Sequence, residues 1–331
     1  MNIFQRYLVE EFAEDYQEGN LSRREALKLI TAVTGSLLMA NSILAACTPQ
    51  DQSTAAPASE STLPPANTPV PAATEGEPTA AETVAPAQGT VSPDDPAVEA
   101  SDVEIPGEGD TILGYLARPS GEGPFGEGPF PVVLVCHENR GLTEHIKDVT
   151  RRLAVAGYVG LAVDLLSRQG GTASMSSDDV PGALGNTSPD QFVQDFTSGW
   201  QYLQGQPYAQ ADRVGMVGFC FGGGVTWLMA TRMPELLAAV PFYGPPPPIE
   251  DVPNINAAVL AIYGERDERI NQTIPDIEAA MQENNKIYEK VIYPNADHAF
   301  HNDTSQRYDA EAAQDAWRRT LEWFGTYVKE A

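Results

Sequence analysis

The sequence predicts an α/β fold in which a mainly parallel sheet carries helices on both faces. Residues 131–136 and 158–164 form continuous apolar runs, which are typical of strands buried on both faces. Between them, residues 144–156 have the apolar spacing of a helix, and Gly157 marks its end. Strands that alternate with helices favour parallel pairing, because each crossover helix packs on a face of the sheet.

The remaining predicted elements continue this alternation. A helix begins after Ser188, where a capping-box pattern has proline at the first helical position, and it runs to about Gln204. Ligands of such sheets bind beyond the carboxyl ends of the strands. Further strands are expected at 111–117, 213–217, 238–242, 257–263 and 286–293, and further helices at 225–230, 274–285 and about 307–329.

The N-terminal 47 residues have the pattern of an export signal. Arg23 and Arg24 precede an uncharged stretch over 29–46, and Leu44-Ala45-Ala46-Cys47 closes it. The pair resembles a twin-arginine signal, with Ala26 where an aromatic residue is usual, and the closing residues resemble a lipoprotein signal. We expect a lipid on Cys47 that anchors the protein to the outer face of the cell membrane. An uncleaved anchor is the alternative, although the Thr, Ser, Gly and Asn content of the stretch argues against it.

Residues 48–100 have the composition of a disordered tether. They contain ten prolines and eight acidic residues, and no lysine, arginine or aromatic residue. Such a composition buries too little apolar surface to offset the chain entropy of folding. The folded domain is therefore expected over residues 101–331, and glycosylation of the tether stays open.

Composition limits the partners of the protein. With 20 basic and 46 acidic residues of 331, the net charge is −26, which makes nucleic-acid binding unfavourable. Three cysteines form no disulfide framework, and no cluster has metal-ligand spacing. We expect a monomer that acts on a small molecule without a metal or organic cofactor.

Residues 218–224 carry the strongest chemical signal. This glycine-rich turn joins the strand at 213–217 to the helix at 225–230. Strand, sharp turn and helix form the nucleophile elbow G-x-S-x-G, which exposes its central side chain above the sheet. Cys220 stands in place of the serine, and a thiolate is the stronger nucleophile.

A thiol nucleophile needs a base and an acid that orients the base. In the elbow folds the acid and then the histidine follow the nucleophile, each on a loop after a strand. Asp267 and His298 meet this order, with Glu265 as the competing carboxylate and His301 as a polar neighbour. The oxyanion would be held by the backbone N–H of Phe221 and by that of Asn139, in the loop after 131–136.

These motifs resemble the dienelactone hydrolase family of α/β hydrolases, from about Asp102 to the C-terminus. The resemblance rests on the loop 137–141, the segment 164–168, the elbow, and the loops at 264–267 and 297–300. It implies an α/β-hydrolase fold and a triad of Cys220, Asp267 and His298. It also implies that Glu138, which otherwise reads as a solvated turn carboxylate, contacts the resting thiol and helps to form the thiolate.

The resemblance further implies that Arg168 binds a substrate carboxylate. Asn302 departs from the family, because members carry a second carboxylate-binding arginine at that position. The expected activity is hydrolysis of a carboxylic ester or lactone through an acyl-thioester. A thioesterase, another acyl hydrolase or peptidase, and a catalytically silent ligand-binding surface lipoprotein remain alternatives.

Overall fold

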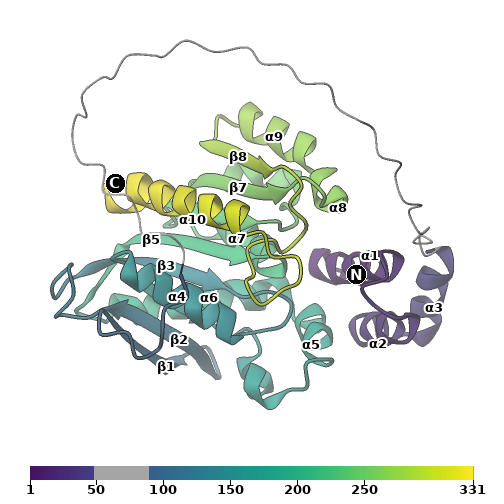
Figure 1. Cartoon of the computed structure of the whole chain (residues 1–331), viewed down its shortest axis with the longest axis horizontal. Helices are drawn as coiled ribbons and strands as arrows, with labels where there is room; N and C mark the ends of the chain where they lie inside the picture. The colour runs from purple at the N-terminus through teal and green to yellow at the C-terminus, as the bar shows by residue number, and fades with distance from the viewer. Residues whose placement is uncertain (48–88, 331) are drawn as a thin grey trace, which may run out of the picture.

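The computed structural model describes residues 1–47 and 89–330, so most of the predicted tether lies outside the described residues. An eight-stranded sheet has the order β1-β2-β4-β3-β5-β6-β7-β8 (Figure 1). Pairs β1–β2 and β2–β4 are antiparallel, and the other pairs are parallel. The strands are β1 (Val98–Pro106), β2 (Thr111–Pro119), β3 (Phe130–Cys136), β4 (Val159–Val163), β5 (Ala209–Phe219), β6 (Ala238–Phe242), β7 (Ala258–Gly264) and β8 (Tyr288–Tyr293).

Helices cover both faces of this sheet, which confirms the predicted fold class. Right-handed crossovers that run in opposite directions, from β3 to β4 and from β4 back to β5, place their helices on opposite faces. Helices α4 (Glu144–Val155) and α10 (Ala310–Phe324) lie in front of the sheet in Figure 1. On the other face, α6 (Pro189–Gln204) packs on α7 (Phe221–Arg232), and α9 (Ile274–Glu283) precedes β8. The side chains of β4, β6 and β7 are buried along their whole length.

The folded region begins before residue 101, which corrects the predicted domain boundary. Strand β1 starts at Val98 and pairs along its whole length with β2. Val91 is also buried: its N–H donates to Asp148 at 2.7 Å, and Arg151 Nε donates to its carbonyl at 2.6 Å. The average composition of 48–100 hid this short segment, because only a few of its residues enter the core.

Two further elements differ from the sequence prediction. Helix α5 (Val180–Asn186) was not predicted, because its proline and glycines have low helix propensity. Tertiary contact stabilises it: a Cβ on Gly182 would lie 2.8 Å from the Cβ of Ala32. At the C-terminus, α10 ends at Phe324 and a π-turn (Gly325–Lys329) follows it.

The N-terminal segment folds into α1 (Ile3–Gln17), α2 (Arg23–Thr34) and α3 (Leu37–Ala46). Capping boxes at Asn2 and Ser22 begin the first two helices. Helices α1 and α2 lie beside α5 at one end of the molecule and α3 packs on α2 (Figure 1), and α1 contacts both α5 and α7. Within the described part of the chain, no helix is long and apolar enough to cross a membrane. The role of residues 1–47 as an export signal stays a prediction.

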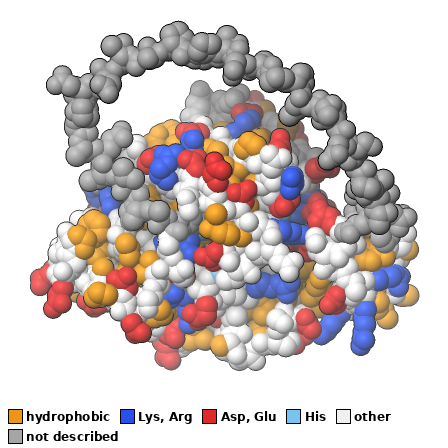
Figure 2. Space-filling model, in the orientation of Figure 1, with side chains coloured by type: hydrophobic (Ala, Val, Ile, Leu, Met, Phe, Trp, Pro, Cys, Tyr) orange, Lys and Arg blue, Asp and Glu red, His pale blue; other side chains and the backbone are white. Residues whose placement is uncertain are grey.

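Acidic and basic side chains are interspersed over the face of the molecule that Figure 2 shows. Many acidic groups are paired locally, as Asp315 is with Arg318 and Arg319 on α10. Neighbouring basic side chains therefore offset part of the acidic charge locally.

Candidate active site

Cys220 lies on a strained turn between β5 and α7. Its backbone has φ 58° and ψ −120°, a conformation that side-chain-bearing residues rarely adopt outside functional sites. The turn closes because its flanking positions are glycines. A Cβ on Gly218 would lie 2.2 Å from the carbonyl oxygen of Gly222, and a Cβ on Gly222 would lie 2.4 Å from that of His137. The sequence Gly-x-Cys-x-Gly therefore folds into the predicted elbow.

Asp267 and His298 approach each other from the carboxyl ends of neighbouring strands. Asp267 follows β7, and His298 follows β8. His298 Nδ1 and Asp267 Oδ2 are 2.6 Å apart. A ring nitrogen of His298, the sulfur of Cys220 and a carboxylate oxygen of Glu11 all lie within 4.8 Å of one another. The exposed fractions of Cys220, Asp267 and His298 are 3%, 3% and 8%, so the group is shielded from solvent.

The charges in this group shift its titration. Burial raises the pKa of Cys220, and the nearby Glu11 carboxylate raises it further. Burial alone would lower the pKa of His298, but Asp267 and the hydrogen bond with Cys220 outweigh it and hold that pKa well above its ordinary value. Burial alone would raise the pKa of Asp267, yet His298 lowers it below its ordinary value. The ionised Asp267 therefore makes the imidazole of His298 a stronger base.

Glu265 and His301, the alternatives to Asp267 and His298, lie in different environments. Glu265 is exposed, and its carboxylate accepts the N–H of Asn295 at 2.8 Å. His301 is fully buried, where its ring stacks on Phe219 with centroids 4.9 Å apart. Burial lowers the pKa of His301 well below its ordinary value, so it acts as a packed neutral ring. The geometry thus distinguishes Asp267 and His298 from their neighbours.

Of the two predicted oxyanion donors, Phe221 is part of the elbow and Asn139 follows the neighbouring strand β3. Phe221 is the first residue of α7, so its N–H has no carbonyl partner within the helix. Asn139 follows β3, the neighbour of β5, and is buried. The Asn139 side-chain amide donates to Glu11 Oε1 at 2.9 Å, which places this loop beside the same carboxylate that faces Cys220.

Glu138 and Arg168 have partners that the resemblance did not imply. Glu138 Oε2 accepts a hydrogen bond from Asn302 Nδ2 at 2.6 Å, while the carboxylate within 3.6–3.8 Å of Cys220 Sγ belongs to Glu11. Burial raises the pKa of Glu138. Arg168 Nη1 is 2.5 Å from Asp195 and its Nε is 3.1 Å from Asp110, so binding a substrate carboxylate would require it to leave these partners.

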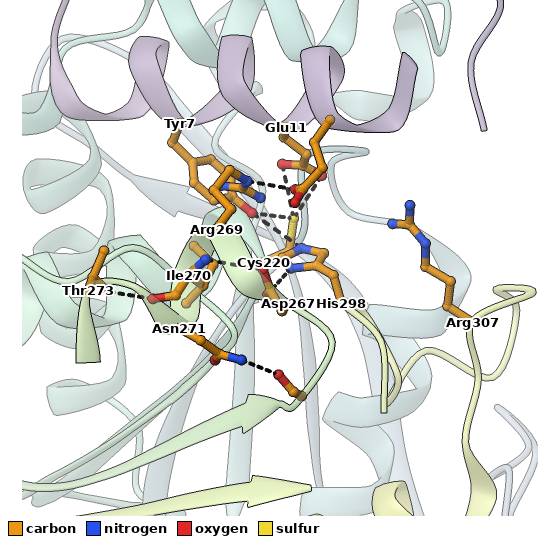
Figure 3. A network of polar contacts seen from close by, with 12 residues as sticks. Tyr7, Glu11, Cys220, Asp267, Arg269, Ile270, Asn271, Thr273, His298 and Arg307 are labelled. Carbon is orange, nitrogen blue, oxygen red and sulfur yellow. Dashed lines mark hydrogen bonds and ion pairs between the residues drawn. The ribbon is translucent and has the colours of Figure 1, made fainter. Parts of the chain in front are cut away.

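Two residues of the N-terminal helix α1 complete the site, and the sequence did not predict them. Tyr7 Oη is 3.2 Å from Cys220 Sγ and 3.4 Å from His298 Nε2. Glu11 lies one turn further along α1, and both side chains point down at the sulfur (Figure 3). The acidic residues at positions 11, 14, 15 and 18 have helical spacing, which indicates a charged helix face but not what that face contacts. The export pattern of residues 1–47 gives no indication of a contact with the active site.

Glu11, Cys220 and His298 also form the one described group whose ligand atoms are close enough to hold a metal ion. Carboxylate, thiolate and imidazole suit zinc. The Asp267 hydrogen bond orients His298 and the strained turn positions Cys220 without a metal ion, and Glu11 comes from a separate segment.

Comparison with known proteins identifies the family of the chain. The model of the family described as "Dienelactone hydrolase family" matches residues 112–328. The "Putative carboxymethylenebutenolidase" of Methylorubrum extorquens is 38% identical over 241 residues, which cover 69% of this chain and 81% of the relative. The protein of the same name from Escherichia coli K12 is 36% identical over 248 residues, covering 70% and 88%.

A solved structure has the same fold. The crystal structure of "Putative Dienelactone Hydrolase" from Klebsiella pneumoniae is 35% identical, with a TM-score of 0.64, and covers 70% of this chain and 100% of its own. Helices α1, α2 and α3 lie outside the residues that the family model matches. The chain belongs to the dienelactone hydrolase family, a family of hydrolases, and has the α/β-hydrolase fold.

Proposed function

We propose that this protein hydrolyses a carboxylic ester or lactone with Cys220 as nucleophile, His298 as base and Asp267 as the acid that orients the base. The observation that carries this proposal is the 2.6 Å contact of His298 Nδ1 with Asp267, on the far side of the imidazole from a cysteine on a strained elbow. Asp267 keeps the proton on Nδ1, so that Nε2 is free to accept one from the thiol. The reaction belongs to the carboxylic ester hydrolases, EC 3.1.1, of which carboxymethylenebutenolidase, 3.1.1.45, is one.

The first half-reaction transfers the acyl group to sulfur. The Cys220 proton passes to His298 Nε2 as the sulfur bonds to the substrate carbonyl carbon. The backbone N–H groups of Phe221 and Asn139 stabilise the negative charge on the carbonyl oxygen. His298 then protonates the departing oxygen, the carbon–oxygen bond breaks, and the acyl group remains as a thioester.

The second half-reaction releases the acid. Water loses a proton to His298 as its oxygen bonds to the thioester carbon. The carbon–sulfur bond breaks, and Cys220 takes back the proton from His298. Each step uses only protein groups, the ester and water, and a lactone differs only because its leaving oxygen stays in the product.

The test removes the nucleophile. Cys220→Ala is expected to lower turnover of an activated aryl ester by about 10³-fold or more. Cys47→Ala, compared with the parent as purified, unprocessed chains, is the matched control, because it removes a thiol outside the site and should change the rate little. Full activity of Cys220→Ala would show that the assignment is wrong.

A panel of substrates shows which kind of acyl bond the protein hydrolyses. An aryl ester, a lactone and a thioester of similar size, compared by kcat/KM, separate an esterase or lactonase from the alternative thioesterase. A protein that binds such compounds without hydrolysing any of them would instead be the silent ligand-binding form.

We also propose that residues 1–47 direct export and that Cys47 carries a lipid. Arg23 and Arg24 are exposed at the start of α2, where an export receptor could reach them. Ala45 and Ala46 are exposed just before Cys47. Metabolic labelling with a fatty-acid analogue would detect the lipid, and absence of label from the mature chain would reject it.

A further inference from the structure

Helix α1 occupies the space that a substrate needs at the nucleophile. A reacting carbonyl carbon must approach to about 3–3.5 Å from the sulfur. Tyr7 Oη is 3.2 Å from Cys220 Sγ, and the Glu11 carboxylate lies at 3.6 and 3.8 Å (Figure 3). With α1 in this position, no ester can reach the thiol.

Polar contacts attach α1 to the residues of the site itself. Glu11 accepts a hydrogen bond from Asn139, and Tyr7 contacts His298 Nε2, the atom that would carry the proton. The helix therefore contacts the nucleophile, the base and the oxyanion loop together. The Glu11 carboxylate beside these groups resembles the negatively charged oxygen that forms when the thiolate attacks an ester.

Two arginines hold the acidic residues of α1 at the rim of the site. Arg269 Nε is 2.9 Å from Glu14, and its guanidinium lies over the Tyr7 ring at 4.6 Å. Arg307 Nη2 is 2.5 Å from Asp15 and 3.2 Å from Glu18. These pairs set the orientation of the helix more than its affinity, because partly exposed ion pairs contribute about 0.2–1 kcal/mol each.

Apolar contacts supply most of the affinity of α1 for the hydrolase domain. Phe4 is 1% exposed and packs on Phe192 and Phe221, with ring centroids 5.3 and 5.1 Å apart. Leu8 and Phe12 are equally buried, while Glu10 on the opposite side of the helix is exposed. The surface that α1 covers thus has aromatic residues, Phe192 and Phe221, near the thiol. Arginines lie at its edge.

The protonation of the Cys220 thiol agrees with a site that α1 blocks. Burial and the Glu11 carboxylate both raise the pKa of Cys220, which keeps the sulfur protonated and unreactive. Tyr7 and Glu11 come from outside the region matched by the family model, so the family domain has a complete triad without them.

We propose that α1 is a built-in plug, an intramolecular inhibitor that occupies the active site with Tyr7 and Glu11 and must leave before substrate binds. The plug, defined as residues Ile3–Gln17, belongs to the segment proposed above to be an export signal. Cleavage before Cys47 would then separate the plug from the hydrolase domain and open the site.

The first test opens the plug in the full chain. Phe4→Lys places a charge against the rings of Phe192 and Phe221, which strongly disfavours the docked position of α1. Glu10→Lys puts the same side chain on the exposed side of the same helix and is the matched control. Alkylation of the peptide that contains Cys220 by iodoacetamide, followed by mass spectrometry, measures access, with Cys47 as internal standard.

We expect Phe4→Lys to speed Cys220 alkylation at least tenfold and to raise ester turnover, while Glu10→Lys leaves both within twofold of the parent chain. Alkylation reports the plug even if no ester is hydrolysed. Faster alkylation without turnover of any ester therefore rejects the proposed function but still supports the proposal that α1 blocks the site. Faster alkylation with lower turnover than the parent chain rejects the plug, because α1 would then supply groups that catalysis needs.

A second test does not depend on a substitution in α1. A protease site placed between residues 48 and 88 lets the purified chain be cut after folding. Dilution of the cut chain should speed Cys220 alkylation, and added fragment 1–47 should slow it again, whereas the uncut chain should show no dependence on concentration. Alkylation that stays slow both in Phe4→Lys and in the cut, diluted chain overturns the proposal.

Discussion

At the scale of single residues, the site separates into groups that sequence order could find and groups that it could not. Asp267 and His298 follow successive strands after the elbow, so motif order was enough to select them over Glu265 and His301. Tyr7 and Glu11 are 213 and 209 residues from Cys220 in the chain, and no local pattern predicts such a contact. The partners of Glu138 and Arg168 were missed for the same reason, because Asn302 and Asp195 reach them only in the folded chain.

Asp267→Asn tests the orienting role of the acid. Loss of the triad acid typically costs about 10⁴-fold in kcat. Because the Asp267 charge helps to raise the pKa of His298, the variant should lower that pKa and move the acid limb of the kcat/KM profile to lower pH.

Glu265→Gln is the matched control for this change, since its carboxylate is exposed and contacts the Asn295 backbone instead. We expect its pH profile to follow that of the parent chain. If Glu265→Gln caused the larger loss, Glu265 would be the acid and the assignment of Asp267 would fail.

At the scale of elements, the sequence predicted what depends on local pattern. Strands β3, β4, β6 and β7 have continuous apolar runs, and α6 has its cap at Ser188, so their positions followed from periodicity. Strand β1 and helix α5 depend on partners elsewhere. β1 forms because β2 offers an edge, and α5 forms because Gly182 lets α2 approach closely. Neither cause is visible within the segment itself.

Gly222→Ala tests whether the elbow requires close backbone approach. The new Cβ would lie 2.4 Å from the His137 carbonyl oxygen and 2.6 Å from that of Cys136, so β3 or the turn must shift. Overpacking of this kind costs about 1–3 kcal/mol in the free energy of unfolding, and the displaced Cys220 should also lose activity.

Gly205→Ala provides the comparison. Gly205 ends α6 with φ −83°, which alanine adopts readily, and the nearest atom to its Cβ is the Tyr202 carbonyl oxygen at 3.5 Å. Urea unfolding should show little change, or a gain of about 0.4–1 kcal/mol, for this variant. Equal stability of the two variants would mean that the elbow tolerates a side chain at position 222.

At the scale of the whole molecule, the chain has a family domain with its triad and an N-terminal segment that carries both the export pattern and the plug. The two roles are compatible, because the exposed faces of α2 present Arg23 and Arg24 while the buried face of α1 covers Cys220. Such an arrangement would keep the hydrolase silent until the segment is removed. The thiol of Cys220 would become accessible to substrate only where the mature protein acts.

Export and opening should therefore occur together. In cells, changing Arg23 and Arg24 to lysine should retain the precursor, and its Cys220 should be alkylated slowly because α1 still covers it. The mature chain that begins at Cys47 lacks α1, so its Cys220 should be alkylated at least tenfold faster at equal concentration. Arg6→Lys, in an exposed arginine of the same segment, should be exported as the parent chain is. Export of the double variant at the parent rate would reject the twin-arginine assignment, and a retained precursor that is alkylated as fast as the mature chain would reject the plug.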